Sequence, residues 1–178
     1  MMDWHKKHLD LLSAVIVNEF LFWYEKIKNK NDSIYAVALI LDEDALTAYL
    51  AVSTWESLND KHEGNKWEPS EWLYTVDDGD VFNDLNSFVK LMIKHYDEDV
   101  IPLYEKGFDY NEERQRNLWM YTEVLKEAKL IIIKKFGSII DEIVFYLSIL
   151  GDHSIEIESS KSINKKSEIL TDLVNYRT

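Results

Sequence analysis

The chain has 178 residues, enough for one domain with a substantial core but too few for two large ones. Apolar residues make up 46% of the chain and aromatic residues 13%, a composition that excludes a disordered protein. The formal net charge is −13, and a field of that sign repels phosphate backbones and anionic lipid. We therefore expect no binding to nucleic acid or to a membrane surface, and attraction to a basic partner instead.

The sequence contains no cysteine, which excludes disulfides, thiolate metal sites and a cysteine nucleophile. Its first residues lack the layout of a signal peptide. The longest apolar run, residues 34–41, is much shorter than the ~20 residues that span a bilayer. These features predict a cytoplasmic protein.

The negative charge is concentrated in the middle of the chain. Residues 42–113 hold nineteen acids and five bases, whereas residues 1–41 are balanced and residues 114–178 carry a balance of +1. Each acidic cluster has a local explanation, because Asp suits turns and acids favour helix N-termini. The scarcity of neutralising lysines favours electrostatic steering of a basic partner. The clusters are Asp42-Glu43-Asp44, Asp77-Asp78 with Asp80, Asp97-Glu98-Asp99, and Asp109 with Glu112-Glu113.

The first predicted element is a long amphipathic helix over residues 5–28, with apolar side chains at steps of three and four. Residues 34–41 and 45–54 follow as two strands joined by the acidic residues 42–44. The first strand is apolar almost throughout, as expected when both of its faces are buried. The short connection predicts an antiparallel hairpin.

The middle of the chain is less regular. Residues 55–76 are expected to be irregular and rich in aromatic side chains. Residues 77–80 are expected to form a turn that also caps a helix reaching about Tyr96. A short helical piece over residues 97–106, interrupted by Pro102, follows.

The last part of the chain begins with a second long helix, from Asn111 to a stop at Gly137. Residues 143–150 favour a third strand, with a helix as the alternative that periodicity does not separate. A final helix is expected over residues 163–176, capped by Ser162. The sequence thus predicts a single α+β domain over residues 1–178, in which several amphipathic helices pack on a small antiparallel sheet made of the hairpin plus the third strand.

Catalytic motifs are missing from the sequence. There is no glycine-rich phosphate loop, no nucleophile elbow and no zinc-protease helix motif. His5 and His8 stand at helical spacing without a third ligand, so they are expected to be solvated. We expect no metal and no cofactor.

Two glutamates lie among apolar or aromatic residues, where a carboxyl group can acquire a catalytic role. Glu71 is the best candidate for a carboxylate-based hydrolase, because flanking tryptophans could remove its side chain from water. The simpler interpretation is that Glu71 supports a turn. Glu19 is expected on the outer face of the first helix.

The segment Trp67-Glu68-Pro69-Ser70-Glu71-Trp72-Leu73-Tyr74 is the most distinctive in the chain. Pro69 suits the first position of a short helix. Trp67 and Trp72 either close this segment over the hairpin or form an exposed aromatic surface with an acidic rim, which is a composition typical of binding hot spots.

The W-x-P-x-E-W pattern of residues 67–72 resembles a bacterial family of unknown function. The likeness extends to the long first helix, the Tyr35-Ala36-Val37-Ala38-Leu39 strand, the Val52-Ser53-Thr54 strand end, and the Phe136-Gly137 stop before an apolar strand and an acidic turn. Its members resemble immunity proteins of polymorphic or contact-dependent growth-inhibition toxin systems. The resemblance implies a cytoplasmic protein that blocks one cognate toxin domain, and it supplies no catalytic residues.

The charge argument agrees with this resemblance, because a toxin that cleaves nucleic acid needs a basic cleft. An acidic inhibitor would be steered to that cleft and could occlude it without performing chemistry. A hydrolase using Glu71 and a non-catalytic acidic adaptor are the alternatives. The residues expected to contact the C-terminal domain of the toxin are Asp42, Glu43, Asp44, Trp55, Trp67, Glu71, Tyr74, Asp77, Asp78, Asp80, Asp97, Glu98 and Asp99.

Overall fold

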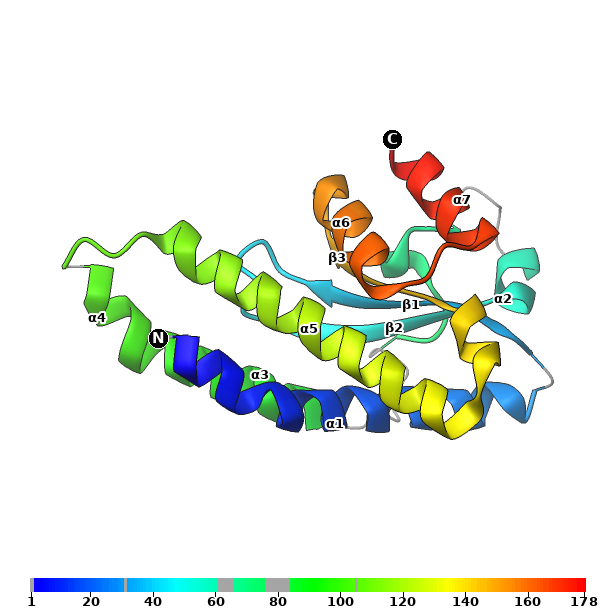
Figure 1. The fold of residues 1–178 in the computed structure, drawn as a ribbon, viewed down its shortest axis with the longest axis horizontal. Helices are drawn as coiled ribbons and strands as arrows, with labels where there is room; N and C mark the ends of the chain where they lie inside the picture. Colours follow the sequence, from blue (N-terminus) through cyan, green and yellow to red (C-terminus); the bar gives the residue numbers. More distant parts are fainter. Residues whose placement is uncertain (1, 31, 61–65, 76–83, 105) are drawn as a thin grey trace.

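The fold consists of a three-stranded sheet and long helices that cover it (Figure 1). The computed structural model describes residues 2–30, 32–60, 66–75, 84–104 and 106–178. The predicted α+β class is confirmed. In chain order the elements are α1 (Met2–Lys28), β1 (Ile34–Leu41), β2 (Ala48–Thr54), α2 (Trp55–Asp60), the 3-10 helix η2 (Pro69–Glu71), α3 (Asp84–His95), the π-helical turn η3 (Tyr96–Val100), α4 (Ile101–Tyr104), α5 (Tyr110–Phe136), the 3-10 helix η4 (Ser138–Glu142), β3 (Val144–Ile149), α6 (His153–Ile163) and α7 (Glu168–Arg177).

The predicted hairpin is confirmed, because β1 and β2 pair antiparallel with Leu39 opposite Leu50. The second strand starts three residues later than expected, since residues 42–47 form the turn. The Asp42 carboxylate accepts hydrogen bonds from the backbone N–H groups of Leu46 and Thr47 at 2.8 and 3.1 Å. Ala45 adopts a positive φ of 53° there, a conformation that is incompatible with a strand.

Residues 144–149 form a strand, so the helical alternative for this segment is wrong. The expectation of an antiparallel sheet fails at this strand, because β3 pairs parallel with β1 in the order β2-β1-β3. A parallel partner requires a long crossover connection, and the chain between β2 and β3 supplies it through α3 and α5. The sheet is therefore mixed.

One face of the sheet packs against α1, α3 and α5; in Figure 1, α1 and α3 lie below the strands and α5 crosses the view diagonally. Alternation along β1 directs Val37, Leu39 and Leu41 to this face. The stripe on α1 that was predicted from its spacing meets them, and Leu12, Ile16 and Phe20 are fully buried. This face carries the larger of the two hydrophobic clusters.

The opposite face of the sheet is covered by the Trp67–Trp72 segment and α7. Small side chains on the strands, Ala36, Ala38 and Ala51, leave room there for the two indole rings. Trp67 is 1% exposed and its ring lies edge-on to Tyr35 at 5.6 Å. Both faces of β1 are thus buried, as its apolar sequence predicts.

Two helices replace the single helix expected over residues 163–176. Helix α6 ends at Ile163 and α7 begins at Glu168, with the backbone extended at Asn164 between them. The hydroxyl of Ser167, not that of Ser162, caps α7 by accepting a hydrogen bond from the N–H of Leu170. Helix α6 lies in a segment, His153–Ile163, for which no helix was expected.

The irregular region expected at residues 55–76 contains α2 and the 3-10 turn η2, which has Pro69 at its first position as predicted. The turn expected at residues 77–80 lies outside the described residues. Pro102 does not interrupt the chain's helical path from Asp84 to Tyr104, because the helix widens to a π turn before it, with the Ile101 N–H bonded to the Tyr96 carbonyl. Within the described part of the chain, no helix is long and apolar enough to cross a membrane.

Asn164 closes the outer edge of β3. Its side-chain amide donates to the Phe145 carbonyl at 2.7 Å, and its amide oxygen accepts from the Phe145 N–H at 2.9 Å. The buried ammonium of Lys129 donates to the same oxygen and to the Ile143 carbonyl, both at 2.8 Å. Ser159 accepts from the N–H of Leu147. Side chains thus replace the missing neighbouring strand.

We predict that Asn164→Ala lowers the free energy of unfolding by about 2–4 kcal/mol, because two backbone groups of Phe145 lose their partners. Urea denaturation measures this difference. Asn175→Ala, at an exposed position of α7, is the matched control and should change stability by less than about 0.5 kcal/mol. Equal effects of the two substitutions would contradict this role of Asn164.

Candidate functional site

Several acidic clusters of the sequence meet at one end of the molecule. The loop 42–44 follows the carboxyl end of β1 and reaches the start of α5, where Tyr110 donates a hydrogen bond to Asp44. Arg114 donates to the Glu43 carbonyl at 2.6 Å and ties this loop to α5. We call this region the acidic end, and its exposed carboxylates are those of Asp42, Glu43, Asp44, Asp97, Glu98, Asp99, Asp109 and Glu112.

Tyrosine side chains connect the parts of the acidic end. The Tyr104 hydroxyl donates to that of Tyr96 at 3.1 Å, and the Tyr104 and Tyr110 rings are 6.3 Å apart. Burial, together with the bond to Tyr96 and the nearby carboxylates, raises the pKa of Tyr104. Tyr104 therefore stays neutral and acts as a hydrogen-bonding group. Figure 1 shows α4 and the connection to α5 projecting beyond the sheet at this end.

A buried polar cluster fixes the helices beneath the acidic end. His5 of α1 lies 2.8 Å from the Asn117 amide oxygen and 3.3 Å from the Glu113 carboxylate, both on α5. His95 of α3 lies 3.9 Å from the same carboxylate, and its ring stacks on Trp4 at 4.2 Å. Three helices are thereby joined at one carboxylate.

The expectation of a solvated His5 is wrong, because its side chain is fully buried. Burial by itself would raise the pKa of Glu113, but hydrogen bonds and charge from His5 and Arg116 outweigh it and hold that pKa below its usual value. The carboxylate is therefore ionised at neutral pH. Among the described residues no group of three His, Cys, Asp or Glu side chains is placed to hold a metal ion.

Carboxylates of the acidic end are only partly neutralised by neighbouring bases. Asp99 pairs with His95 at 2.7 Å, Glu98 lies 3.9 Å from Lys94, and Glu112 lies 3.1 Å from Arg116. Each pair joins residues four positions apart in its own helical segment. The side chains of Asp99, Glu98 and Glu112 remain 60–65% exposed. Solvated pairs of this kind leave most of the negative potential in place.

The aromatic residues proposed as contacts do not join this end. Trp67 and Tyr74 are 1% and 4% exposed, so both belong to the core and cannot touch a partner while the domain is folded. Of the three, only Trp55 is open to solvent, at 41% exposed, and it lies where β2 passes into α2. An acidic face around the Trp67–Trp72 segment, as the sequence suggests, is therefore not formed by these residues.

Glu71 does not occupy the environment that an acid catalyst needs. It ends the 3-10 turn η2 and is exposed, whereas both neighbouring tryptophans turn toward the sheet. Its backbone N–H bonds to the Glu68 carbonyl, in line with a structural role in the turn. Asp77, Asp78 and Asp80 lie outside the described residues.

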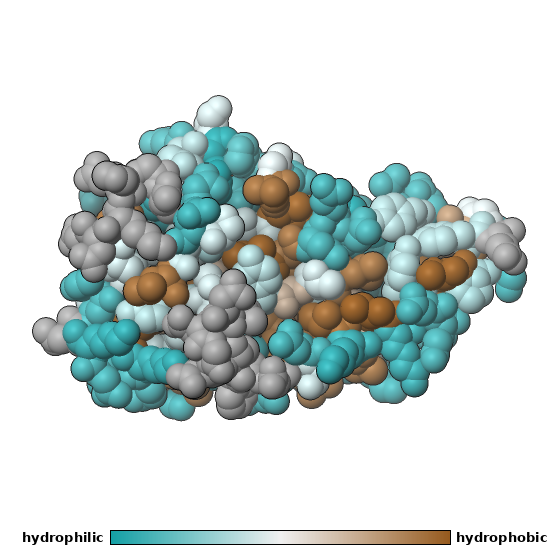
Figure 2. Space-filling model, turned by 180° about the vertical axis from the view of Figure 1, so that it is seen from behind, coloured by the Kyte–Doolittle hydropathy of each residue, from teal (hydrophilic) through white to brown (hydrophobic). Residues whose placement is uncertain are grey.

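The face of the molecule seen in Figure 2 shows hydrophobic side chains in separate patches divided by hydrophilic ones. Recognition through one continuous apolar surface is therefore not indicated on that face. The acidic end, by contrast, combines exposed charge with rigid aromatic groups.

Comparison of the chain with models of protein families, with characterised proteins and with solved structures gave no match.

Glu19 departs from its expected place on the outer face of α1. It is 7% exposed and accepts a hydrogen bond from the Leu85 N–H, in the first turn of α3, at 3.3 Å. Burial raises the pKa of Glu19 to about 7, the bond to Leu85 opposes this, and the charge of Asp84 adds to it. The sequence gives no sign of this inward orientation, because an acidic residue next to apolar ones on an amphipathic helix is ordinarily placed on its outer face.

We predict that Glu19→Gln stabilises the domain above neutral pH. A carboxyl whose pKa is higher in the folded state contributes stability that is full below pH 4.5 and is lost as the pH rises through about 7. Glutamine accepts the Leu85 bond without ionising. The variant should match the natural protein near pH 4.5 and exceed its free energy of unfolding by about 2–3 kcal/mol at pH 8.

Chemical denaturation at a series of pH values measures this difference. Glu25→Gln, at an exposed position of the same helix, is the control and should show little dependence on pH. A stability difference for Glu19→Gln that stays constant between pH 5 and 8 would contradict the assignment.

Proposed function

We propose that this chain is a non-catalytic immunity protein that binds a basic toxin domain and blocks it. The observation that carries the proposal is the acidic end, where exposed carboxylates from separate parts of the chain meet on a rigid support. A single-sign field of this kind accelerates association with an oppositely charged partner. The W-x-P-x-E-W likeness to immunity proteins supports the same function.

A rigid support matters because ordering flexible side chains on binding costs free energy. Loop 42–44 is fixed by its own turn hydrogen bonds and by Tyr110 and Arg114. The segment 96–104 is fixed by the stacking of His95 on Trp4 and by the bond between Tyr96 and Tyr104. The backbone segments that carry the carboxylates are thus held by contacts to neighbouring elements.

A nuclease domain fits this arrangement well, since its substrate-binding cleft must carry positive potential to hold a polyanion. The inhibitor would occupy the cleft as a competitor of the nucleic acid. Hydrolysis by Glu71 is not favoured, because that residue lies exposed at the end of a turn. A general acidic adaptor differs from an immunity protein by binding several partners with similar affinity.

The proposal predicts that a gene next to that of this chain encodes a basic toxin domain. Co-expression of the chain with that domain, with cell survival and complex formation as the readouts, then tests the inhibition. The double variant Glu43→Lys/Asp97→Lys should reduce the association rate at low salt at least about 10-fold and flatten its dependence on ionic strength. The dissociation rate should change less.

The matched control is Glu25→Lys/Glu127→Lys, which makes the same change in net charge at exposed positions of α1 and α5 away from the acidic end. The control should alter the association rate only slightly. If both double variants slow association equally, the effect comes from net charge and not from the acidic end, which contradicts the proposal. Full protection of cells by the Glu43→Lys/Asp97→Lys protein would also contradict binding through this end.

A further inference from the structure

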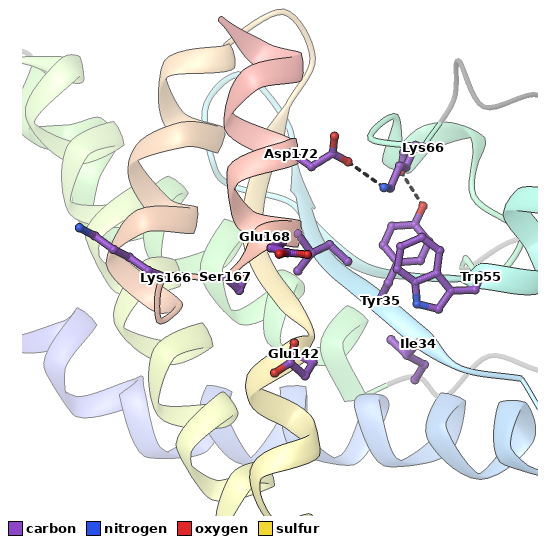
Figure 3. Close-up of a pocket in the computed structure, with 10 residues that line it drawn as sticks. Ile34, Tyr35, Trp55, Lys66, Glu142, Lys166, Ser167, Glu168 and Asp172 are labelled. Carbon is purple, nitrogen blue, oxygen red and sulfur yellow. Dashed lines mark hydrogen bonds and ion pairs between the residues drawn. The ribbon is translucent and has the colours of Figure 1, made fainter.

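A second feature lies at the opposite end of the strands, where a cleft of about 670 Å³ opens beside the start of β1 (Figure 3). One wall is aromatic, because Tyr35 and Trp55 pack together with ring centres 4.7 Å apart. The other wall is the first part of α7, from Ser167 to Asp172, and Glu142 lies at its lower edge in Figure 3.

The cleft already holds one cation from the chain itself. The Lys66 ammonium lies 4.9 Å from the centre of the Trp55 ring and 5.8 Å from that of Tyr35. It pairs with Asp172 at 2.7 Å, and this hydrogen bond lowers the pKa of the Asp172 carboxyl. Aromatic faces next to a carboxylate are the surroundings that attract ammonium and guanidinium groups.

The rest of the lining leaves negative charge uncompensated. Glu142 and Glu168 are exposed, and neither forms an ion pair with any residue that the structure describes. Lys166 also lines the cleft, but its ammonium points away from the other side chains drawn in Figure 3. The start of α7 would favour an anion, but Ser167 already caps it and Glu168 brings a carboxylate into its first turn. The cleft is therefore better suited to a cation than to phosphate.

A smaller hollow of about 400 Å³ continues from this cleft and shares Ile34, Trp55 and Glu142 with it. Its lining is more apolar and includes Ile139, which is 66% exposed. Trp55 thus lines both hollows, and the second is the more apolar of the two although Lys28, Asp32 and Glu142 also line it. A ligand that fits both has a cationic group next to an aliphatic one.

We propose that this cleft binds an arginine side chain of a basic peptide segment, with a neighbouring aliphatic residue in the hollow beside Ile139. Arginine fits better than lysine, because its planar guanidinium stacks on the indole ring while donating to a carboxylate such as that of Glu168. The site goes beyond the proposed function, since β1 separates it from the acidic end by about 25 Å.

The test uses the peptide acetyl-Gly-Arg-Leu-Gly-amide, titrated into the full chain and followed by calorimetry and by the indole N–H signal of Trp55 in NMR spectra. We expect binding with a dissociation constant on the order of 1 mM. Acetyl-Gly-Gln-Leu-Gly-amide, which lacks the charge, should bind at least about 5-fold more weakly.

Variants locate the binding. Trp55→Ala and Glu168→Gln should each weaken the arginine peptide at least about 3-fold, and circular dichroism reports whether each variant is folded. Glu127→Gln removes the same charge from an exposed site on α5 and should have no effect. Lys66→Gln should strengthen binding about 2-fold or more, because it removes the internal cation that competes for the same rings.

Three results would overturn the proposal. They are unchanged affinity in Glu168→Gln, equal affinity for the arginine and glutamine peptides, and a shift of the Trp55 signal by inorganic phosphate but not by the arginine peptide. The last result would assign the cleft to anions held by Lys66 and the start of α7. None of these outcomes depends on the acidic end.

Discussion

The structure depends on one constraint: a sheet of only three strands is buried on both faces. β1 lies at its centre, so each of its side chains needs a partner above or below the sheet. Long helices meet the larger residues on one side, and two tryptophans fill the space left by alanines on the other. Asn164 and Ser159 satisfy outer backbone groups of β3, because no further strand lies beside it in the described part of the chain.

The same strand separates two regions of different chemistry. Beyond its carboxyl end, carboxylates gather on helices that a buried histidine and glutamate pair hold together. Beside its amino end, aromatic rings and carboxylates surround a lysine. In both places buried or half-buried polar contacts fix exposed charge, so the protein presents defined charged groups and not a diffuse negative surface.

The sequence predicts those parts of the fold that local periodicity determines. The stripe on α1 and the apolar run of β1 repeat at the spacing of their elements, so both were located to within a few residues. No local sequence pattern indicates that β3 runs parallel to β1, because its direction depends on the path of the crossover connection. Helix α6 was missed since Ser159 and Ser160 stand at its buried positions, where an apolar pattern would be sought.

The candidate site was predictable in its charge and not in its contacts. Clusters 42–44 and 97–99 are visible in the sequence, but Tyr110 and Arg114, which tie the first of them to α5, lie far away along the chain. The burial of His5 was detectable in the sequence, because His5 continues the apolar stripe of Leu9 and Leu12.

The closed edge of β3 has a consequence for recognition. Since Asn164 occupies the outward N–H and carbonyl of Phe145, a foreign peptide cannot extend the sheet there by strand addition. A partner that binds at this edge must therefore contact side chains, because it cannot form backbone hydrogen bonds with Phe145.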